Sequence, residues 1–222
     1  MRRLRVRSAM GAAMLAMAAG PDAARAQSGP SWRGTGEVIG EAREGAVAQE
    51  RTETARIVRA AGVSGRRFVV RIDGTLDAHK RRRLANAGIT IVSALGDGWC
   101  IARSDAARAV RDAEVAAREI GTALVITPAD RVHAALGAGE VPAHAVVADD
   151  AVLGRTIAVA IAFHLDATDA EIDAVVAGAG GIERSRAASM PVVTVEMPEA
   201  SLGFVSGADA VSWVEPVLPG LS

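Results

Sequence analysis

The chain has 222 residues, of which 25 are basic and 26 are acidic, so its formal net charge at pH 7 is −1. This balance lacks the strong basic excess that is typical of a nucleic-acid-binding protein, and no nucleic-acid partner is expected. The single cysteine, Cys100, excludes an intramolecular disulfide framework. It lies between apolar neighbours in a predicted strand, and we expect it to be a small buried hydrophobe rather than a reactive thiol.

Residues 1–26 have the pattern of a secretory signal peptide. Four arginines precede an apolar run at residues 9–20, and Ala24-Arg25-Ala26 fits a small-x-small cleavage site before Gln27. The apolar run is too short to span a bilayer. The pattern therefore predicts a secreted or periplasmic protein with no membrane association after signal cleavage, although a cytosolic amphipathic start is the alternative. Removal of five arginines and one aspartate leaves 20 basic and 25 acidic residues, a net charge of about −5.

Two segments connect or precede the more regular parts of the chain. Residues 27–65 are polar and charged, and they predict a flexible lead with one weak helix near residues 44–61. Residues 131–154 predict a linker, with a turn of helix near residues 129–136.

The two remaining segments, residues 66–130 and 155–219, repeat one order of elements: strand, helix, strand, turn, strand, helix, strand. This order predicts an α+β protein built from two tandem ferredoxin-like βαββαβ units with antiparallel sheets. Residues 220–222 form a short tail. The alternative is two unrelated α+β segments that happen to alternate.

Local signals place the elements of each unit. The first unit has predicted strands at residues 68–73, 89–94, 99–102 and 123–127, and a helix at 105–112 follows the third of them. Gly96-Asp97-Gly98 predicts the turn of a hairpin. The second unit has predicted strands at residues 157–163, 192–195 and 211–217 and a helix at 198–206. Thr168 and Glu171 have the spacing of a capping box, and Gly88 and Gly181 are expected to end helices.

The alternation of apolar residues predicts two separate cores. We expect the first core to contain Phe68, Val70, Ile72, Leu84, Ile101 and Val125. We expect the second core to contain Val159, Ile161, Val175, Val193, Val195 and Trp213.

The sequence predicts no catalytic, cofactor-binding or metal-binding residues, and hence no enzyme. The four histidines lack the i, i+4 spacing of a helical zinc site, and there is no cysteine pair. Ser189 and Ser206 have no base that the sequence identifies, and there is no Gly-x-Ser-x-Gly elbow. Asp149, Asp150 and Asp209 are expected in solvated turns. The basic run at residues 80–83 is expected to be a solvated helix face.

Particular residues add a family resemblance to this order of elements. Residues 67–73, 84–91 and 98–102, together with the segment Val211-Ser212-Trp213-Val214-Glu215-Pro216, resemble the N-terminal propeptide region of secreted subtilisin-like serine proteases. The similarity covers most of residues 66–219. No catalytic domain with the Asp-, His- and Ser-centred motifs of that family follows in this sequence.

The resemblance implies a secreted propeptide-like module that binds, inhibits or assists the folding of a subtilisin-like serine protease. In that family the C-terminal segment of the propeptide blocks the active-site cleft. The matching residues here are Val217, Leu218, Pro219, Gly220, Leu221 and Ser222. The alternative is an extracytoplasmic interaction or structural module of the same fold with no protease partner.

Overall fold

The computed structural model describes residues 31–32, 37–38, 47–64, 66–152 and 154–217. The predicted signal peptide therefore lies outside the described residues. No helix among the described residues is long and apolar enough to cross a membrane. The first described elements are two short paired strands, β1 (Ser31–Trp32) and β2 (Glu37–Val38).

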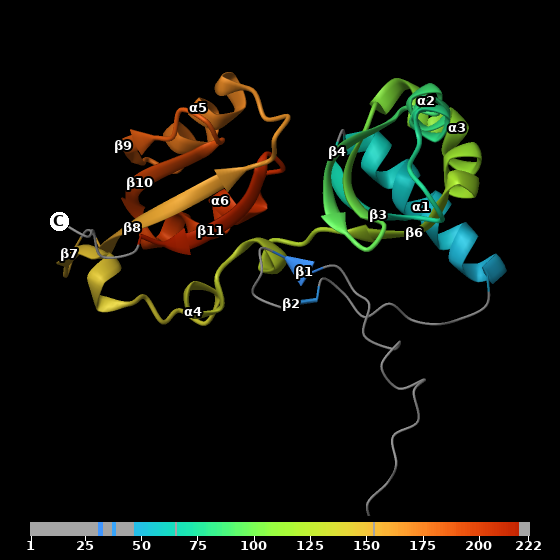
Figure 1. The fold of residues 1–222 in the computed structure, drawn as a ribbon. Helices are drawn as coiled ribbons and strands as arrows, with labels where there is room; N and C mark the ends of the chain where they lie inside the picture. The colour runs from blue at the N-terminus through green and yellow to red at the C-terminus, as the bar shows by residue number, and fades with distance from the viewer. Residues whose placement is uncertain (1–30, 33–36, 39–46, 65, 153, 218–222) are drawn as a thin grey trace, which may run out of the picture.

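The first unit contains an antiparallel four-stranded sheet with the strand order β4-β5-β3-β6. Its elements follow the predicted succession along the chain (Figure 1). They are β3 (Arg67–Ile72), α2 (Ala78–Asn86), β4 (Ile89–Gly96), β5 (Trp99–Ser104), α3 (Ala106–Glu119) and β6 (Ile120–Val125).

The second unit contains a sheet with the order β11-β8-β10-β9, in which all neighbouring strands are also antiparallel. Its elements are β8 (Gly154–Phe163), α5 (Asp169–Gly178), β9 (Ile182–Arg186), β10 (Val192–Pro198), α6 (Leu202–Gly207) and β11 (Val211–Pro216). The prediction of an α+β chain with two antiparallel sheets is therefore confirmed.

The second sheet has a fifth strand that the sequence did not predict. β7 (Val146–Asp150) pairs antiparallel with the beginning of β8. It belongs to the segment predicted as a linker, which also contains α4 (Ala134–Gly137) and short 3₁₀ turns at Ala129–Arg131 and Ala143–Ala145. The prediction of four strands per sheet is wrong for the second unit, because this segment folds back onto β8.

Helix α1 (Val47–Ser64) belongs to the first unit and is not an isolated element of a polar lead. Its residues Ile57, Val58 and Ala61 are buried in one core with residues of β3 and α2. In Figure 1, α1, α2 and α3 lie on the side of the first sheet away from the second unit. The first sheet is therefore covered by three helices where two were predicted.

Turn and cap residues explain where several elements begin and end. The Thr168 hydroxyl accepts from the Glu171 N–H while the Glu171 carboxylate accepts from the Thr168 N–H, which is the predicted capping box. Asp97 and Gly98 have φ values of 50° and 80°, as a tight hairpin turn between β4 and β5 requires. The left-handed residue after α5 is Gly180, with φ 64°, and not the predicted Gly181.

Most of the predicted core residues are buried in two clusters, one between each sheet and its helices. Val125 is an exception, since it is 51% exposed at the end of the edge strand β6. Ile101 and Trp213 are buried, but on the other faces of their sheets. The prediction is wrong for these three residues because alternation assigns a face without showing what covers it.

The two units pack against each other through the sheet faces that carry no helices. Val69, Trp99 and Ile101 of the first sheet form one buried cluster with Ala162 and Trp213 of the second. The described residues thus form three apolar clusters, of which the third joins the two units.

Candidate functional site

The predicted protease-binding segment begins at the end of β11. Val217 is half-buried, and its N–H donates to the Ala158 carbonyl at 3.1 Å, which continues the pairing of β11 with β8. The other predicted residues lie outside the described residues: Leu218, Pro219, Gly220, Leu221 and Ser222. Of the predicted protease-binding segment, the structure therefore describes only the first residue, Val217.

The edge of β8 on which β11 lies is shared with β7. β10 occupies the opposite edge of β8 from Thr156 to Ala162, so β7 and β11 must both lie on the remaining edge. β11 pairs from Phe163 back to Val159, and β7 pairs from Ile157 back to Gly154. The backbone of β8 from Gly154 to Ile157 is therefore already paired with β7 on the edge where β11 ends.

A cluster of charged side chains lies where the two units meet. Arg67, at the start of β3, is 3% exposed. Its Nε donates to Asp166 at 2.8 Å, its Nη1 donates to Asp209 at 2.9 Å, and its Nη2 lies 3.5 Å from a Glu171 oxygen. Arg103 makes a second ion pair with Asp166 at 2.9 Å. Both arginines come from the first unit, and all three acids come from the second.

The backbone at Arg67 belongs to the same cluster. The Arg67 N–H donates to both carboxylate oxygens of Asp209, at 3.0 and 3.2 Å. Burial disfavours the charged guanidinium of Arg67, but Asp166 and Asp209 outweigh this effect and the pKa of Arg67 lies above its ordinary value. Asp209 lies in a turn as expected, but the expectation that it is solvated is wrong, because its carboxylate is bound by Arg67.

Arg131 and His164 complete the buried part of the cluster. Arg131 Nη1 donates to the carbonyls of Ala208 and Ser206 at 2.7 and 3.2 Å. Burial lowers the pKa of Arg131, while Asp209, 3.7 Å from its Nη2, opposes that change. Burial together with the neighbouring cations lowers the pKa of His164 to about 3, so the buried imidazole is neutral at pH 7.

Glu171 connects this cluster to the start of α5. Burial raises the pKa of its carboxyl, but hydrogen bonds from the Thr168 N–H and hydroxyl and the charge of Arg67 outweigh burial, so the pKa is lowered overall. The capping box and the ion cluster therefore stabilise the same ionised carboxylate.

The apolar contact between the units is built around two tryptophans. Trp99 is 1% exposed, and Trp213 is 2% exposed. The Trp213 Nε1–H donates to Glu215 at 3.0 Å, which satisfies the one polar atom of the buried indole. The Arg71 guanidinium lies 6.0 Å from the centre of the Trp99 ring system, at the limit of a cation–π contact.

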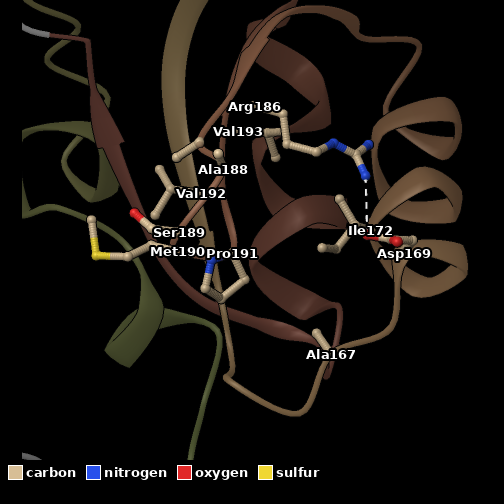
Figure 2. A pocket seen from close by; sticks show the side chains of 11 residues that line it. Ala167, Asp169, Ile172, Arg186, Ala188, Ser189, Met190, Pro191, Val192 and Val193 are labelled. Carbon is tan, nitrogen blue, oxygen red and sulfur yellow. Dashed lines mark hydrogen bonds and ion pairs between the residues drawn. The ribbon is translucent and has the colours of Figure 1, made fainter.

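A pocket of about 270 Å³ lies between the start of α5 and the β9–β10 connection (Figure 2). Its cation, Arg186, is already bound by Asp169 at 3.4 Å, Asp173 at 2.5 Å and Glu183 at 2.7 Å. Hydrogen bonds to Glu183 and Asp173 raise the pKa of Arg186, and the neighbouring carboxylates neutralise its charge. Ser189 lines the pocket with Met190 and Pro191, and no histidine lines it. We find no arrangement here for activating the Ser189 hydroxyl.

The remaining residues considered for chemistry are dispersed. Among the described residues, no group of three or more His, Cys, Asp or Glu side chains could hold a metal ion. Cys100 is buried in the first core, and burial raises the pKa of its thiol. Ser206 is 4% exposed and donates from its Oγ to the Gly203 carbonyl.

Sequence reasoning missed the charged cluster between the units. The pair Arg66-Arg67 indicated a local basic run, yet Arg66 is exposed and Arg67 is buried. Strand alternation in β3 could have indicated the position of Arg67, because it places this residue on the same face of the sheet as Val69 and on the opposite face from Phe68. No protein family, curated protein or solved structure matches the chain.

Proposed function

We propose that this chain is a propeptide-like module that binds a subtilisin-like serine protease, and that its two units are ferredoxin-like. The strand orders β4-β5-β3-β6 and β11-β8-β10-β9 support the second part, because each places the first strand of a unit between its fourth and third. The proposed protein is exported, loses residues 1–26, and acts by binding rather than by catalysis.

The observation that carries the proposal is the end of β11. β11 pairs with β8 as far as Val159, the Val217 N–H binds the Ala158 carbonyl, and the β8 backbone beyond it is already paired with β7. An extended segment with free N–H and C=O groups can add as a strand to the substrate cleft of a protease. Val217, Leu218 and Leu221 would then supply apolar side chains to the subsites of the cleft.

A second candidate function is an extracytoplasmic interaction or structural module without a protease partner. One observation favours it. The helix-free face of the second sheet, through which a propeptide would dock, is partly covered by the first unit through Ala162 and Trp213. Docking through that face would require the two units to separate.

An inhibition assay tests the proposal. Residual activity of a subtilisin-like protease is measured against the concentration of the mature protein, of a variant that lacks residues 218–222, and of Asp149→Asn. Asp149 is exposed on β7 and serves as the matched control. We expect competitive inhibition that the deletion weakens strongly and that Asp149→Asn leaves unchanged.

Two outcomes would contradict the protease proposal. They are coincident curves for the full-length and deleted proteins, and no inhibition by either at micromolar concentration. Either result would leave the interaction module as the better interpretation of the fold.

A further inference from the structure

A groove of about 400 Å³ lies between α1 and α3, on the helical side of the first unit. Its lining includes two small residues, Ala55 and Ala117, which are 9% exposed or less. Thr52 and Glu114 also line it. A ligand backbone can therefore approach both helices closely, because neither alanine extends far from its helix.

The other lining residues are basic. Arg51, Arg56, Arg59 and Arg118 are exposed, and Glu114 is the single acid of the lining. Arg56 is bound by Glu53, with Nε and Nη2 at 2.8 and 2.5 Å from its carboxylate oxygens. Within the described part of the chain, Arg51, Arg59 and Arg118 make no ion pair. The groove is thus positive on a chain whose overall charge is −1.

We propose that this groove binds an acidic peptide segment of a partner protein. Arg51 and Arg59 are eight positions apart on α1, so about 12 Å separates them along the helix axis. An extended peptide advances about 13 Å over four residues, so acidic side chains at positions i and i+4 of such a segment match this spacing. Arginine suits this ligand because its guanidinium can bind a carboxylate with two parallel hydrogen bonds.

The site is separate from the features used for the proposed function. α1 contributes Ile57, Val58 and Ala61 to the core on the helical side of the first sheet. The cluster that joins the two units lies on the opposite side of that sheet, with Val69 and Trp99. A partner in the groove would therefore leave β11 and Val217 unobstructed, and the inference does not depend on a protease.

Binding of a fluorescently labelled oligoglutamate peptide to the full mature chain tests the inference by fluorescence polarisation. We expect saturable binding that weakens as salt is added, since exposed charge pairs are screened. Arg59→Glu and Arg118→Glu should each weaken binding about tenfold or more, because each removes a charge-assisted contact and adds a repulsive one. Arg82→Glu is the matched control, since Arg82 is exposed on α2 outside the groove.

Circular dichroism of each variant verifies that the fold is retained. Equal binding of an oligoglutamine peptide of the same length would overturn the proposal, as would full binding by Arg59→Glu and Arg118→Glu. If Arg82→Glu weakened peptide binding as much as the groove variants do, the peptide would be attracted to the charged surface in general, and the proposal would also be overturned. Tighter binding of a single-stranded oligonucleotide than of oligoglutamate would assign the groove to nucleic acid instead.

Discussion

At the scale of single residues, Arg67 shows how one side chain takes its role from distant partners. Its carboxylate partners Asp166 and Asp209 are 99 and 142 positions away in the chain. Arg66, its neighbour, is exposed. The arginine pair could be noted from sequence, but its separation into one solvated and one buried cation could not, because the partners belong to another unit.

We expect Arg67→Met to lower the free energy of unfolding by about 3 kcal/mol. The substitution keeps much of the side-chain volume but removes the buried cation that Asp166 and Asp209 share, which leaves Asp166 with Arg103 and Asp209 with the more distant Arg131. Arg83→Ala is the control, because Arg83 pairs with Glu119 at an exposed position and should contribute less than about 1 kcal/mol. Chemical denaturation of both variants measures the difference in the free energy of unfolding. Equal losses would show that the buried cluster contributes no more to stability than an exposed ion pair does.

His164 should make stability depend on pH. In the unfolded chain it binds a proton near pH 6.5, whereas its pKa in the folded protein is about 3. Between these values the unfolded state binds more protons, so stability is fully present above pH 6.5 and is lost as the pH falls toward 3. From pH 7.5 to pH 5.0 the loss should reach about 2 kcal/mol.

Denaturation at pH 7.5, 6.5 and 5.0 tests this expectation on the wild type, His164→Gln and His144→Gln. The first substitution should flatten the dependence on pH. The second should leave it unchanged, because His144 is exposed. A wild type that is equally stable at pH 7.5 and pH 5.0 would contradict a neutral buried His164 beside Arg67 and Arg131.

At the scale of elements, the sequence predicted caps and turns correctly where the residues of one short segment determine them. The capping box of α5 and the turn at Asp97-Gly98 depend on residues within a few positions of each other. β7 was missed because Val146-Val147-Ala148-Asp149-Asp150 does not alternate and forms a strand only by pairing with β8. α1 was predicted but underestimated, since its apolar residues gain their role from β3 and α3.

Gly98→Ala should destabilise the protein by about 1 to 2 kcal/mol. Gly98 has φ 80°, and an added Cβ would lie 3.2 Å from the Ile72 carbonyl oxygen. Gly137→Ala is the matched control. Gly137 is the last residue of α4 and has no atom within 4 Å of an added Cβ, so the change should be neutral or stabilising by up to about 1 kcal/mol. If the thermal midpoints fell equally for both variants, the turn would not require glycine at position 98.

At the scale of the whole molecule, the repeated order of elements predicted two antiparallel sheets, but not their contact. Alternation assigned Ile101 and Trp213 correctly to buried positions and incorrectly to the cores of their own units. A strand with apolar residues on both faces can be covered by a helix layer or by another sheet, and the sequence does not distinguish these. Of the predicted protease-binding segment only Val217 lies among the described residues, and its role in binding stays a prediction.

The contact between the sheets should make the two units unfold together. Trp99, Trp213 and Arg67 are each less than 4% exposed, and each depends on the opposite unit for cover or charge compensation. Differential scanning calorimetry of the wild type should therefore show one transition. Ala162→Glu places a carboxylate in the cluster between the units without entering either separate core, so it should split the transition into two or shift part of it to lower temperature.

Ala158→Glu provides a control that differs only in position. Ala158 lies four residues earlier on the same strand and therefore on the same face of the sheet, but it is half-exposed and lies outside the joining cluster. A carboxylate there can remain hydrated, so a single transition near that of the wild type is expected. Two separate transitions in the wild type, or identical changes in both glutamate variants, would show that the two sheets are stabilised independently and that their contact contributes little to the folded state.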